Sequence, residues 1–333
     1  MLPASLIFLV SAALVIIAGS VLSSRADAIA DHTGFGRVWL GSVLLAGATS
    51  LPELATDVVA VRIGAPNLAA GDLFGSSLAN MLILAVIDLL PPPRRVLSQA
   101  ALENALSACL AIVLNAMATL FVLIRLPWPA FGISPQSAML LLVYLAGSRA
   151  LYRNGLRQAS TQAQPQRKAH PPRHALRRAI AEFAAAAAVI LVVSPALAWS
   201  AEQIAVASGL GATFIGTLLL GLCTSLPELI TSLAAVRIGA LDLAVGNLFG
   251  SNAFNMVIFV VLDLAAPRTS IFAALSPVHA TSGVLSIILM SLGLAAIMYR
   301  AERRLIMIEP DSALMVAAYL LAIWLLYTLS GVK

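Results

Sequence analysis

The sequence predicts an all-α polytopic membrane protein in which about ten transmembrane helices form a five-plus-five inverted-topology repeat. Three observations predict this fold class: an apolar composition, an internal repeat and the distribution of the basic residues. Of the 333 residues, 60% are hydrophobic and only 11% are charged. Many apolar runs reach the ~20 residues that a helix needs to cross the hydrocarbon core of a bilayer.

Hydropathy places the individual helices. No basic segment precedes the first apolar run, Leu2 to Leu22, so we expect a retained helix there rather than a cleaved signal peptide. The expected helices span approximately residues 3–28, 36–63, 67–90, 96–124, 127–151, 177–199, 211–238, 242–264, 273–299 and 312–330.

A polar segment at residues 153–177, rich in Gln, Pro and Arg, predicts a flexible basic linker. It separates a first transmembrane half, residues 1–152, from a second half, residues 178–333. With this linker in the cytoplasm, 16 of the 20 basic residues fall on the cytoplasmic side, in agreement with the positive-inside rule. We therefore expect both termini to lie outside.

The formal charge of +5 would suggest nucleic-acid binding in a soluble protein. Here most basic residues lie in loops between apolar runs, so they indicate orientation in a lipid bilayer and no nucleic-acid partner is expected. Cys109 and Cys223 both lie in apolar runs and are too few for a disulfide framework or a cysteine metal site. The sequence leaves the oligomeric state open.

An internal repeat relates the two halves. α-repeat 1, about residues 41–90, aligns without a gap to α-repeat 2, about residues 216–265, with 29 identities in 50 positions. Five helix steps separate the copies, an odd number, so they cross the membrane in opposite directions. Inverted repeats are typical of secondary transporters, whose binding site lies near the midplane where the repeats meet.

Each repeat places a glutamate directly after a proline inside a transmembrane segment. Proline lacks an N–H, and its ring clashes with the carbonyl four residues back. Pro52 and Pro227 are therefore expected to break their helices and to free the carbonyls of Ala48 and Cys223. Freed carbonyls in broken helices coordinate cations, and a cation would also offset the cost of burying the glutamates.

The neighbouring residues supply further oxygens. A Thr-Ser pair precedes each glutamate by four and three residues and shares its side of the helix, and a Ser and an Asn four residues apart form a polar stripe in the next helix. GxxxG spacings at Gly71/Gly75 and Gly246/Gly250 allow close helix approach. Such hard ligands suit Na+ and Ca2+ as transported ions, with no cofactor. The expected ion-binding residues are Thr49, Ser50, Glu53, Ser76, Asn80, Thr224, Ser225, Glu228, Ser251 and Asn255.

The motifs "TSLPEL" with "GSSLANM" and "TSLPEL" with "GSNAFNM" resemble the paired α-repeats of the sodium/calcium exchanger family, prokaryotic type, within the cation/Ca2+ antiporter superfamily. The resemblance covers essentially the whole chain and implies the same ten ion-binding residues and a prokaryotic inner (plasma) membrane. It implies that predicted helices 2, 3, 7 and 8 form the ion-binding core and that helices 1 and 6 are the moving gate. Two features depart from the usual pattern. Ala48 and Cys223 replace glycine before the Thr-Ser pairs, and Asn255, an Asp in some members, forms with Asn80 a pair that resembles potassium-independent exchangers.

These observations predict a secondary active transporter, not an enzyme, that exchanges Na+ for Ca2+ by alternating access. Glu53 and Glu228 balance one Ca2+ or two Na+, and a third Na+, as in the family, would make the exchange electrogenic. H+/Ca2+ exchange through the same glutamates is the alternative, because carboxyl groups can also take up protons. A passive channel would be distinguished by its flux kinetics.

Two acidic residues occur in the first repeat only. Asp57 and Asp72 correspond to Ser232 and Asn247 in the second repeat. Because they extend the polar stripes towards the outside, we expect them to line an acidic external vestibule that concentrates cations.

A second acidic pair, Asp88 and Asp263, is repeated in both halves at helix ends, which favours placement at the membrane interface. An intramembrane aspartyl protease would need these residues face to face at one depth, together with a GxGD motif. The antiparallel repeats and the absence of that motif from the sequence argue against this alternative.

Overall fold

The computed structural model describes residues 2–33, 36–89, 96–100, 103–126, 133–161, 173–207, 221–222, 224–266, 270–299 and 310–329. These residues are almost entirely helical, as the all-α class predicts. The helices are α1 (Leu2–Thr33), α2 (Arg37–Trp39), the π-helix η1 (Leu40–Leu45), α3 (Ala46–Thr49), α4 (Leu51–Arg62), α5 (Pro66–Asp88), α6 (Val96–Gln99), α7 (Glu103–Ile124), α8 (Pro135–Thr161), α9 (Arg173–Ala207), α11 (Leu226–Arg237), α12 (Leu241–Ala265), α13 (Ile271–Ala274), α14 (His279–Tyr299) and α15 (Pro310–Leu329).

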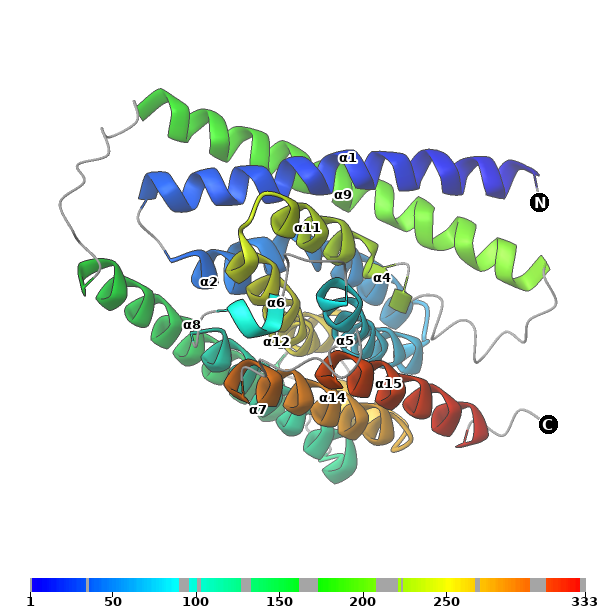
Figure 1. Cartoon of the computed structure of the whole chain (residues 1–333). Helices are drawn as coiled ribbons and strands as arrows, with labels where there is room; N and C mark the ends of the chain where they lie inside the picture. The colour runs from blue at the N-terminus through cyan, green and yellow to red at the C-terminus, as the bar shows by residue number, and fades with distance from the viewer. Residues whose placement is uncertain are drawn as a thin grey trace.

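Two long helices, α1 and α9, lie side by side along one side of the molecule, and α7, α8, α14 and α15 lie on the opposite side (Figure 1). Between them lie α5 and α12, one from each repeat, which are the most deeply buried of the described membrane-spanning helices. The start of α1 and the end of α15 lie at the right of Figure 1, whereas α8 ends and α9 begins at the left. The start of α1 and the end of α15 thus share one side of the molecule, and the end of α8 and the start of α9 share the other.

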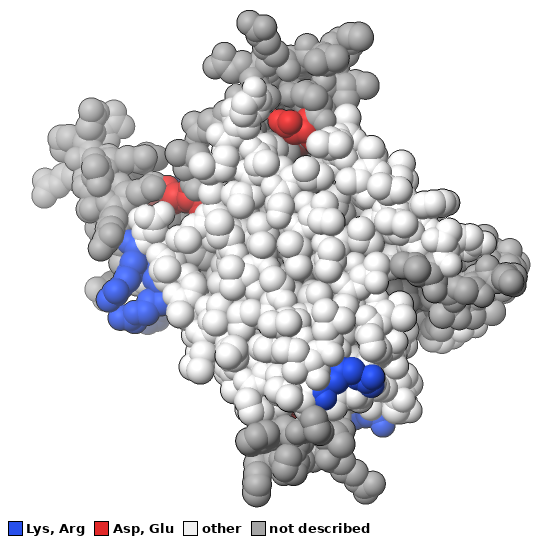
Figure 2. Space-filling model, turned by 90° about the horizontal axis from the view of Figure 1, so that it is seen from below, with Lys and Arg blue, Asp and Glu red and all other residues white. Residues whose placement is uncertain are grey.

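The outer surface of the described residues is apolar. Leu9, Leu142 and Val192 are 65%, 66% and 75% exposed, which in water would be costly. The face shown in Figure 2 is broad and mostly uncharged, with its charged side chains near the edges. An apolar belt with charges at its margins is the surface that a bilayer solvates.

Seven described helices are long and apolar enough to cross a membrane, and the bent pair formed by residues 37–49 and 51–62 adds an eighth. The predicted span 127–151 corresponds to α8, which continues to Thr161 and is therefore more polar. The predicted span 211–238 contains α11, and most of its first part lies outside the described residues. The prediction of about ten spans is compatible with this structure.

The predicted linker at residues 153–177 is partly helical. Helix α8 runs on to Thr161, and α9 already begins at Arg173. The first proline of the segment is Pro165, so nothing in residues 153–161 forbids a continued helix, and Leu, Arg, Gln and Ala in that stretch favour one. Residues 162–172 lie outside the described part of the chain.

The two repeats fold alike. Helices α4 and α11 each have 12 residues, and each is followed by a glycine with positive φ, 84° at Gly64 and 80° at Gly239. Glycine adopts this left-handed conformation without steric cost. Helix α1 packs against α11, and α9 packs against α4. The first long helix of each half therefore covers the glutamate-bearing helix of the other half.

Glycines let the helices of the two halves approach closely. A β-carbon at Gly250 in α12 would lie 2.4 Å from the backbone of Ser42 in η1, and one at Gly246 would lie 3.2 Å from the Ser42 hydroxyl. In the first repeat, the backbone of Gly75 lies 3.1 Å from the β-carbon position of Gly221. Such backbone contacts are what the GxxxG spacing predicts.

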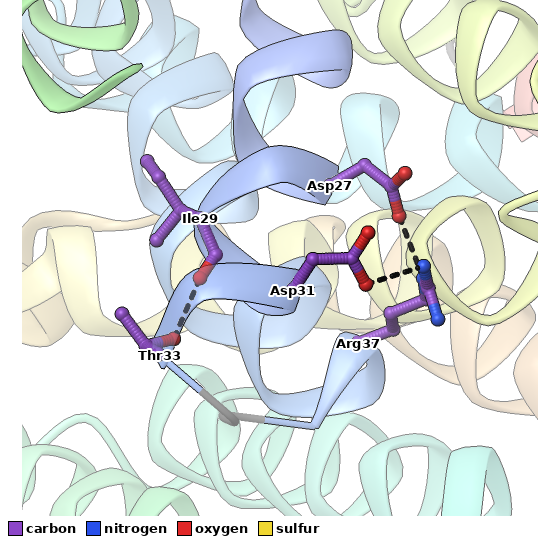
Figure 3. A network of polar contacts seen from close by, with 5 residues as sticks. All are labelled: Asp27, Ile29, Asp31, Thr33 and Arg37. Carbon is purple, nitrogen blue, oxygen red and sulfur yellow. Dashed lines mark hydrogen bonds and ion pairs between the residues drawn. The ribbon is translucent and has the colours of Figure 1, made fainter. Parts of the chain in front are cut away.

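Ion pairs fasten the chain reversal between α1 and α2 (Figure 3). The guanidinium of Arg37 reaches Asp27 at 2.6 Å and Asp31 at 3.0 Å, and the Thr33 hydroxyl donates to the Ile29 carbonyl at 2.7 Å. These contacts hold the start of α2, and with it the entry to the broken span, against the end of α1.

Candidate ion-binding site

A helix break positions the first glutamate. The chain runs through η1 and α3, breaks at Ser50 and resumes as α4 at an angle of 43°. Pro52 lies in the first turn of α4, where its missing N–H costs nothing. Ser225 has nearly the same backbone angles as Ser50 (φ −81° and ψ 4°, against −86° and 7°), and Pro227 takes the same place in α11. Both glutamates therefore stand in the first turn of a resumed helix.

The ten predicted ion-binding residues are all buried. Thr224 is 1% exposed, and the other nine have no exposed surface. The buried residues in the described part of the chain include no Lys, Arg or His, so no basic side chain neutralises the glutamates. An unpaired buried carboxylate costs several kcal/mol. A cation bound among these residues would remove that cost.

Glu228 is held by hydroxyl groups from both halves. Its Oε1 accepts hydrogen bonds from Ser50 at 3.3 Å and from Ser251 at 3.2 Å. The Thr49 hydroxyl lies 3.4 Å from the Ser251 hydroxyl and 3.3 Å from Asn247 Oδ1. No described residue donates to Glu228 Oε2. The structure therefore brings first-half hydroxyls directly to the second-half carboxylate.

Glu53 lacks such partners. Neither of its oxygens accepts a hydrogen bond from another described residue. The Ser76 hydroxyl lies 3.2 Å from the Thr224 hydroxyl, which in turn donates to Asp72 Oδ1 at 3.1 Å. The Ser225 hydroxyl is also unpaired within the described structure. The first-half carboxylate therefore has no hydrogen bond from the described residues, whereas the Thr224 hydroxyl contacts Ser76 and Asp72.

The two predicted asparagines differ in their contacts. Asn80 donates to Asn252 Oδ1 at 2.9 Å, whereas the amide of Asn255 has no hydrogen-bond partner among the described residues. The Asn252 side chain donates to the backbone carbonyl of Ser77 at 3.3 Å. The backbone carbonyl of Asn252 accepts a hydrogen bond from the Asn115 side chain in α7 at 3.2 Å. Sequence reasoning missed Asn252 and Asn115. Their signal was an amide inside an apolar transmembrane run, where it needs a partner.

Apart from Asn255 Nδ2, the unsatisfied side-chain atoms of the ten predicted residues are oxygens of the kind that hard cations prefer. They include both carboxylate oxygens of Glu53, Oε2 of Glu228 and the Oδ1 atoms of Asn80 and Asn255. No group of three or more His, Cys, Asp or Glu side chains in the described residues is placed to hold a metal ion. An ion in this site would therefore need hydroxyl, amide and backbone oxygens beside the carboxylates.

The backbone at the first break is partly engaged. The Thr49 hydroxyl lies 3.1 Å from the Leu45 carbonyl oxygen and 3.2 Å from that of Ala46. Ala48 is buried, with 8% of its surface exposed, and Cys223 lies outside the described residues. Ion coordination by the carbonyls of these last two residues stays a prediction.

Asp57 and Asp72 do not line an open vestibule in this structure. Both have no exposed surface, and their carboxyl groups interact electrostatically with each other. Helices α4 and α5 pack together, and Thr224 from the second half contacts Asp72. The expected external vestibule is therefore corrected to a buried acidic pair, which interacts electrostatically with Glu53.

Asp88 and Asp263 have structural roles at helix ends. Asp88 accepts a hydrogen bond from the Leu97 amide at 2.8 Å, and Asp263 accepts from the amides of Ile271 at 2.6 Å and Ser134 at 2.9 Å. Each aspartate thus ties the end of its helix to the segment packed against it.

Inverted repeats with broken helices that meet at a buried, oxygen-rich and acidic centre define the class of secondary active transporters. The family described as "Sodium/calcium exchanger protein" matches residues 4–148 and 178–332. The match covers most of the chain, so the chain belongs to this family. It is accordingly a membrane cation/Ca2+ antiporter and not an enzyme.

Individual relatives agree with this assignment. The inner membrane protein YrbG of Escherichia coli (strain K12) is 28% identical over 272 residues, which cover 80% of each chain. The sodium/calcium exchanger MaX1 of Methanosarcina acetivorans is 46% identical over 57 residues, 17% of this chain and 16% of that protein. A structure of the sodium-calcium exchanger NCX_Mj matches with a TM-score of 0.73 and 19% identity, covering 99% of both chains. This last similarity shows the fold.

Proposed function

We propose that the chain exchanges Na+ for Ca2+ by alternating access, with both ions as substrates of one site between the repeats. The observation that carries the proposal is the burial of Glu53 and Glu228, one from each inverted repeat, without a basic partner among the described residues. Two carboxylates balance one Ca2+ or two Na+. The two ion loads can therefore replace each other without a large change in net charge.

The proposed ligands are the ten predicted side chains and the carbonyl oxygens of Ala48 and Cys223. Hydroxyl, amide and carbonyl oxygens are neutral, so they can coordinate either ion while the glutamates supply the charge. Asn80 and Asn255 add no third carboxylate, which supports exchange without K+. A third Na+ would move one positive charge per cycle, and transport would then respond to voltage by about 2.3 kcal/mol per 100 mV.

We propose that α1 and α9 form the moving gate. Each contacts the glutamate-bearing helix of the opposite half. Gly19 in α1 lies against α11, where a β-carbon would stand 3.0 Å from the Ile230 side chain. A small residue at such a contact allows one helix to slide over another. Movement of the pair would open the buried site to one side of the membrane at a time.

The proposed orientation places both termini outside a prokaryotic inner (plasma) membrane and the linker in the cytoplasm. Its support is the position of the start of α1 and the end of α15 on one side of the molecule, opposite the end of α8 and the start of α9 (Figure 1). Arg25 of α1 and Arg178 of α9 both form ion pairs with Glu182, which lies in the first part of α9. Basic residues gather on the cytoplasmic side of membrane proteins.

Uptake of radioactive Ca2+ into Na+-loaded proteoliposomes, at fixed pH and clamped voltage, tests the proposal. We expect uptake to require the outward Na+ gradient and to fall at least about a hundredfold in Glu53→Gln. Glu103→Gln, at the start of α7 and outside the site, is the matched control and should keep wild-type uptake. Uptake driven by a pH gradient would favour H+/Ca2+ exchange, and the absence of any Ca2+ flux would contradict both.

A further inference from the structure

A second acidic group lies beside the proposed exchange site and has no part in the exchange chemistry described above. Asp57 in α4 and Asp72 in α5 are both fully buried. The equivalent residues of the second repeat, Asn247 and Ser232, are hydrogen-bonded at 3.0 Å, and the two carboxyl groups of the first repeat interact electrostatically. Two ionised carboxylates cannot bond to each other, because neither has a proton to donate. A bound cation or a proton would offset the repulsion between them.

Most oxygens of this aspartate pair have no donor. Neither oxygen of Asp57, nor Oδ2 of Asp72, accepts a hydrogen bond from the described residues. Asp72 Oδ1 accepts one from Thr224 at 3.1 Å. Glu53, one helical turn before Asp57, likewise has no hydrogen-bond partner in the described part of the chain, and it interacts electrostatically with both aspartates. The buried residues that the structure describes offer no Lys, Arg or His to balance these three carboxylates.

The second repeat shows what the fold requires at this place. There Asn247 donates to the Ser232 hydroxyl at 3.0 Å and to the Thr231 hydroxyl at 3.1 Å. This neutral pair joins α11 to α12 as the aspartates join α4 to α5. The corner between α11 and α12 therefore folds without charge, and the buried acids of the first repeat add a cost that a bound cation or a proton would offset.

We propose that Asp57 and Asp72 hold a second hard divalent cation of the Ca2+ class beside the exchange site. Two carboxylates match the charge of one divalent ion, and carboxylate and hydroxyl oxygens are ligands that Ca2+ prefers. The Thr224 hydroxyl touches Asp72 and Ser76, so it links this pair to the proposed exchange site. The inference rests on the proposed function only in that the neighbouring site is taken to be the exchange site.

Equilibrium binding of radioactive Ca2+ to the purified full-length protein, in Na+-free detergent solution, tests the inference. We expect about two Ca2+ ions per wild-type chain and about one in Asp57→Ser/Asp72→Asn. This variant carries the residues that the second repeat already has at these places, so it should fold. Asp57→Asn/Asp72→Asn, which preserves side-chain shape, should lose the same ion. Glu53→Gln/Glu228→Gln should lose the ion of the exchange site and retain about one.

An equal number of Ca2+ ions bound to the wild type and to both aspartate variants would overturn the inference, and the pair would then be held by a proton. Na+-driven uptake, measured on the same preparations, separates this result from the proposed function. Uptake with a single bound ion would preserve exchange and refute the aspartate site. Binding that falls in the aspartate variants, in a protein without Na+-driven uptake, would support the aspartate site and refute exchange.

Discussion

The two glutamates occupy equivalent positions in the repeats but differ in their surroundings. Glu228 accepts hydrogen bonds from Ser50 and Ser251, whereas Glu53 has none from the other described residues and interacts with two buried aspartates. The backbone at the two breaks is nearly the same. The two repeats are thus alike in their backbone, whereas Asp57 and Asp72 concentrate negative charge in the first repeat.

The largest expected effect tests whether both halves are required. Glu228→Gln should reduce Na+-driven Ca2+ uptake at least about a hundredfold, as Glu53→Gln should, because each removes half of the charge that balances Ca2+. The measurement is uptake into Na+-loaded proteoliposomes. If Glu228→Gln transported normally while Glu53→Gln did not, the ion would be bound by the first half alone.

A second prediction concerns the contact between the halves. A β-carbon at Gly250 would meet the Ser42 backbone at 2.4 Å, and backbone cannot rotate away as a side chain does. Gly250→Ala should therefore destabilise the protein by about 3 kcal/mol. Gly47→Ala is the control, since its nearest atom is in the Phe254 ring at 3.5 Å. Thermal unfolding in detergent compares them, and equal melting temperatures would show that the helices can separate locally.

A third prediction compares the unpaired and the paired glutamate in ion-free protein. Glu53→Gln removes a buried charge that has no hydrogen-bond partner among the described residues, and it should stabilise the protein by about 1–3 kcal/mol. Glu228→Gln should stabilise it less, because it also weakens two hydrogen bonds. Melting temperatures in Na+-free and Ca2+-free buffer test this. A larger gain for Glu228→Gln would mean that the hydrogen-bond pattern does not describe the ion-free state.

The smallest expected effect concerns single hydroxyl groups. Ser50→Ala removes a hydrogen bond to Glu228 and should cost about 0.5–1.5 kcal/mol of stability in ion-free protein. Ser225→Ala removes a hydroxyl that is unpaired in the described structure and should cost less. Thermal unfolding of the two variants side by side measures the difference. If the two variants lost the same stability, the Ser225 hydroxyl would form a hydrogen bond as strong as that of Ser50.

The fold and much of the candidate site followed from local patterns. The broken helices at Pro52 and Pro227 follow from the covalent structure of proline, and the burial of Glu53 and Glu228 follows from the apolar runs that contain them. The partners of those residues could not be read in the same way. Asn252, for example, contacts Asn80 across the two repeats, at a separation in sequence that no helical spacing encodes.

The linker and the aspartate pair show the same limit. Hydropathy marks where a helix leaves the membrane but not where it ends, so the helical parts of residues 153–177 were predicted as linker. Asp57 and Asp72 were expected at an external opening because helical spacing gives a direction along the helix without saying what covers it. In the structure, Thr224 of the opposite half contacts Asp72.

By itself the sequence determined the all-α membrane class, the repeat, its inversion and the acidic residues at its centre. These features follow from the composition of single segments, from the alignment of two segments and from the number of helices between them. Only the tertiary structure decided that, among the described residues, Glu228 has hydrogen-bond donors and Glu53 has none, and that two further aspartates are buried near Glu53. Such differences arise where helices from the two halves meet, and that contact depends on packing in three dimensions.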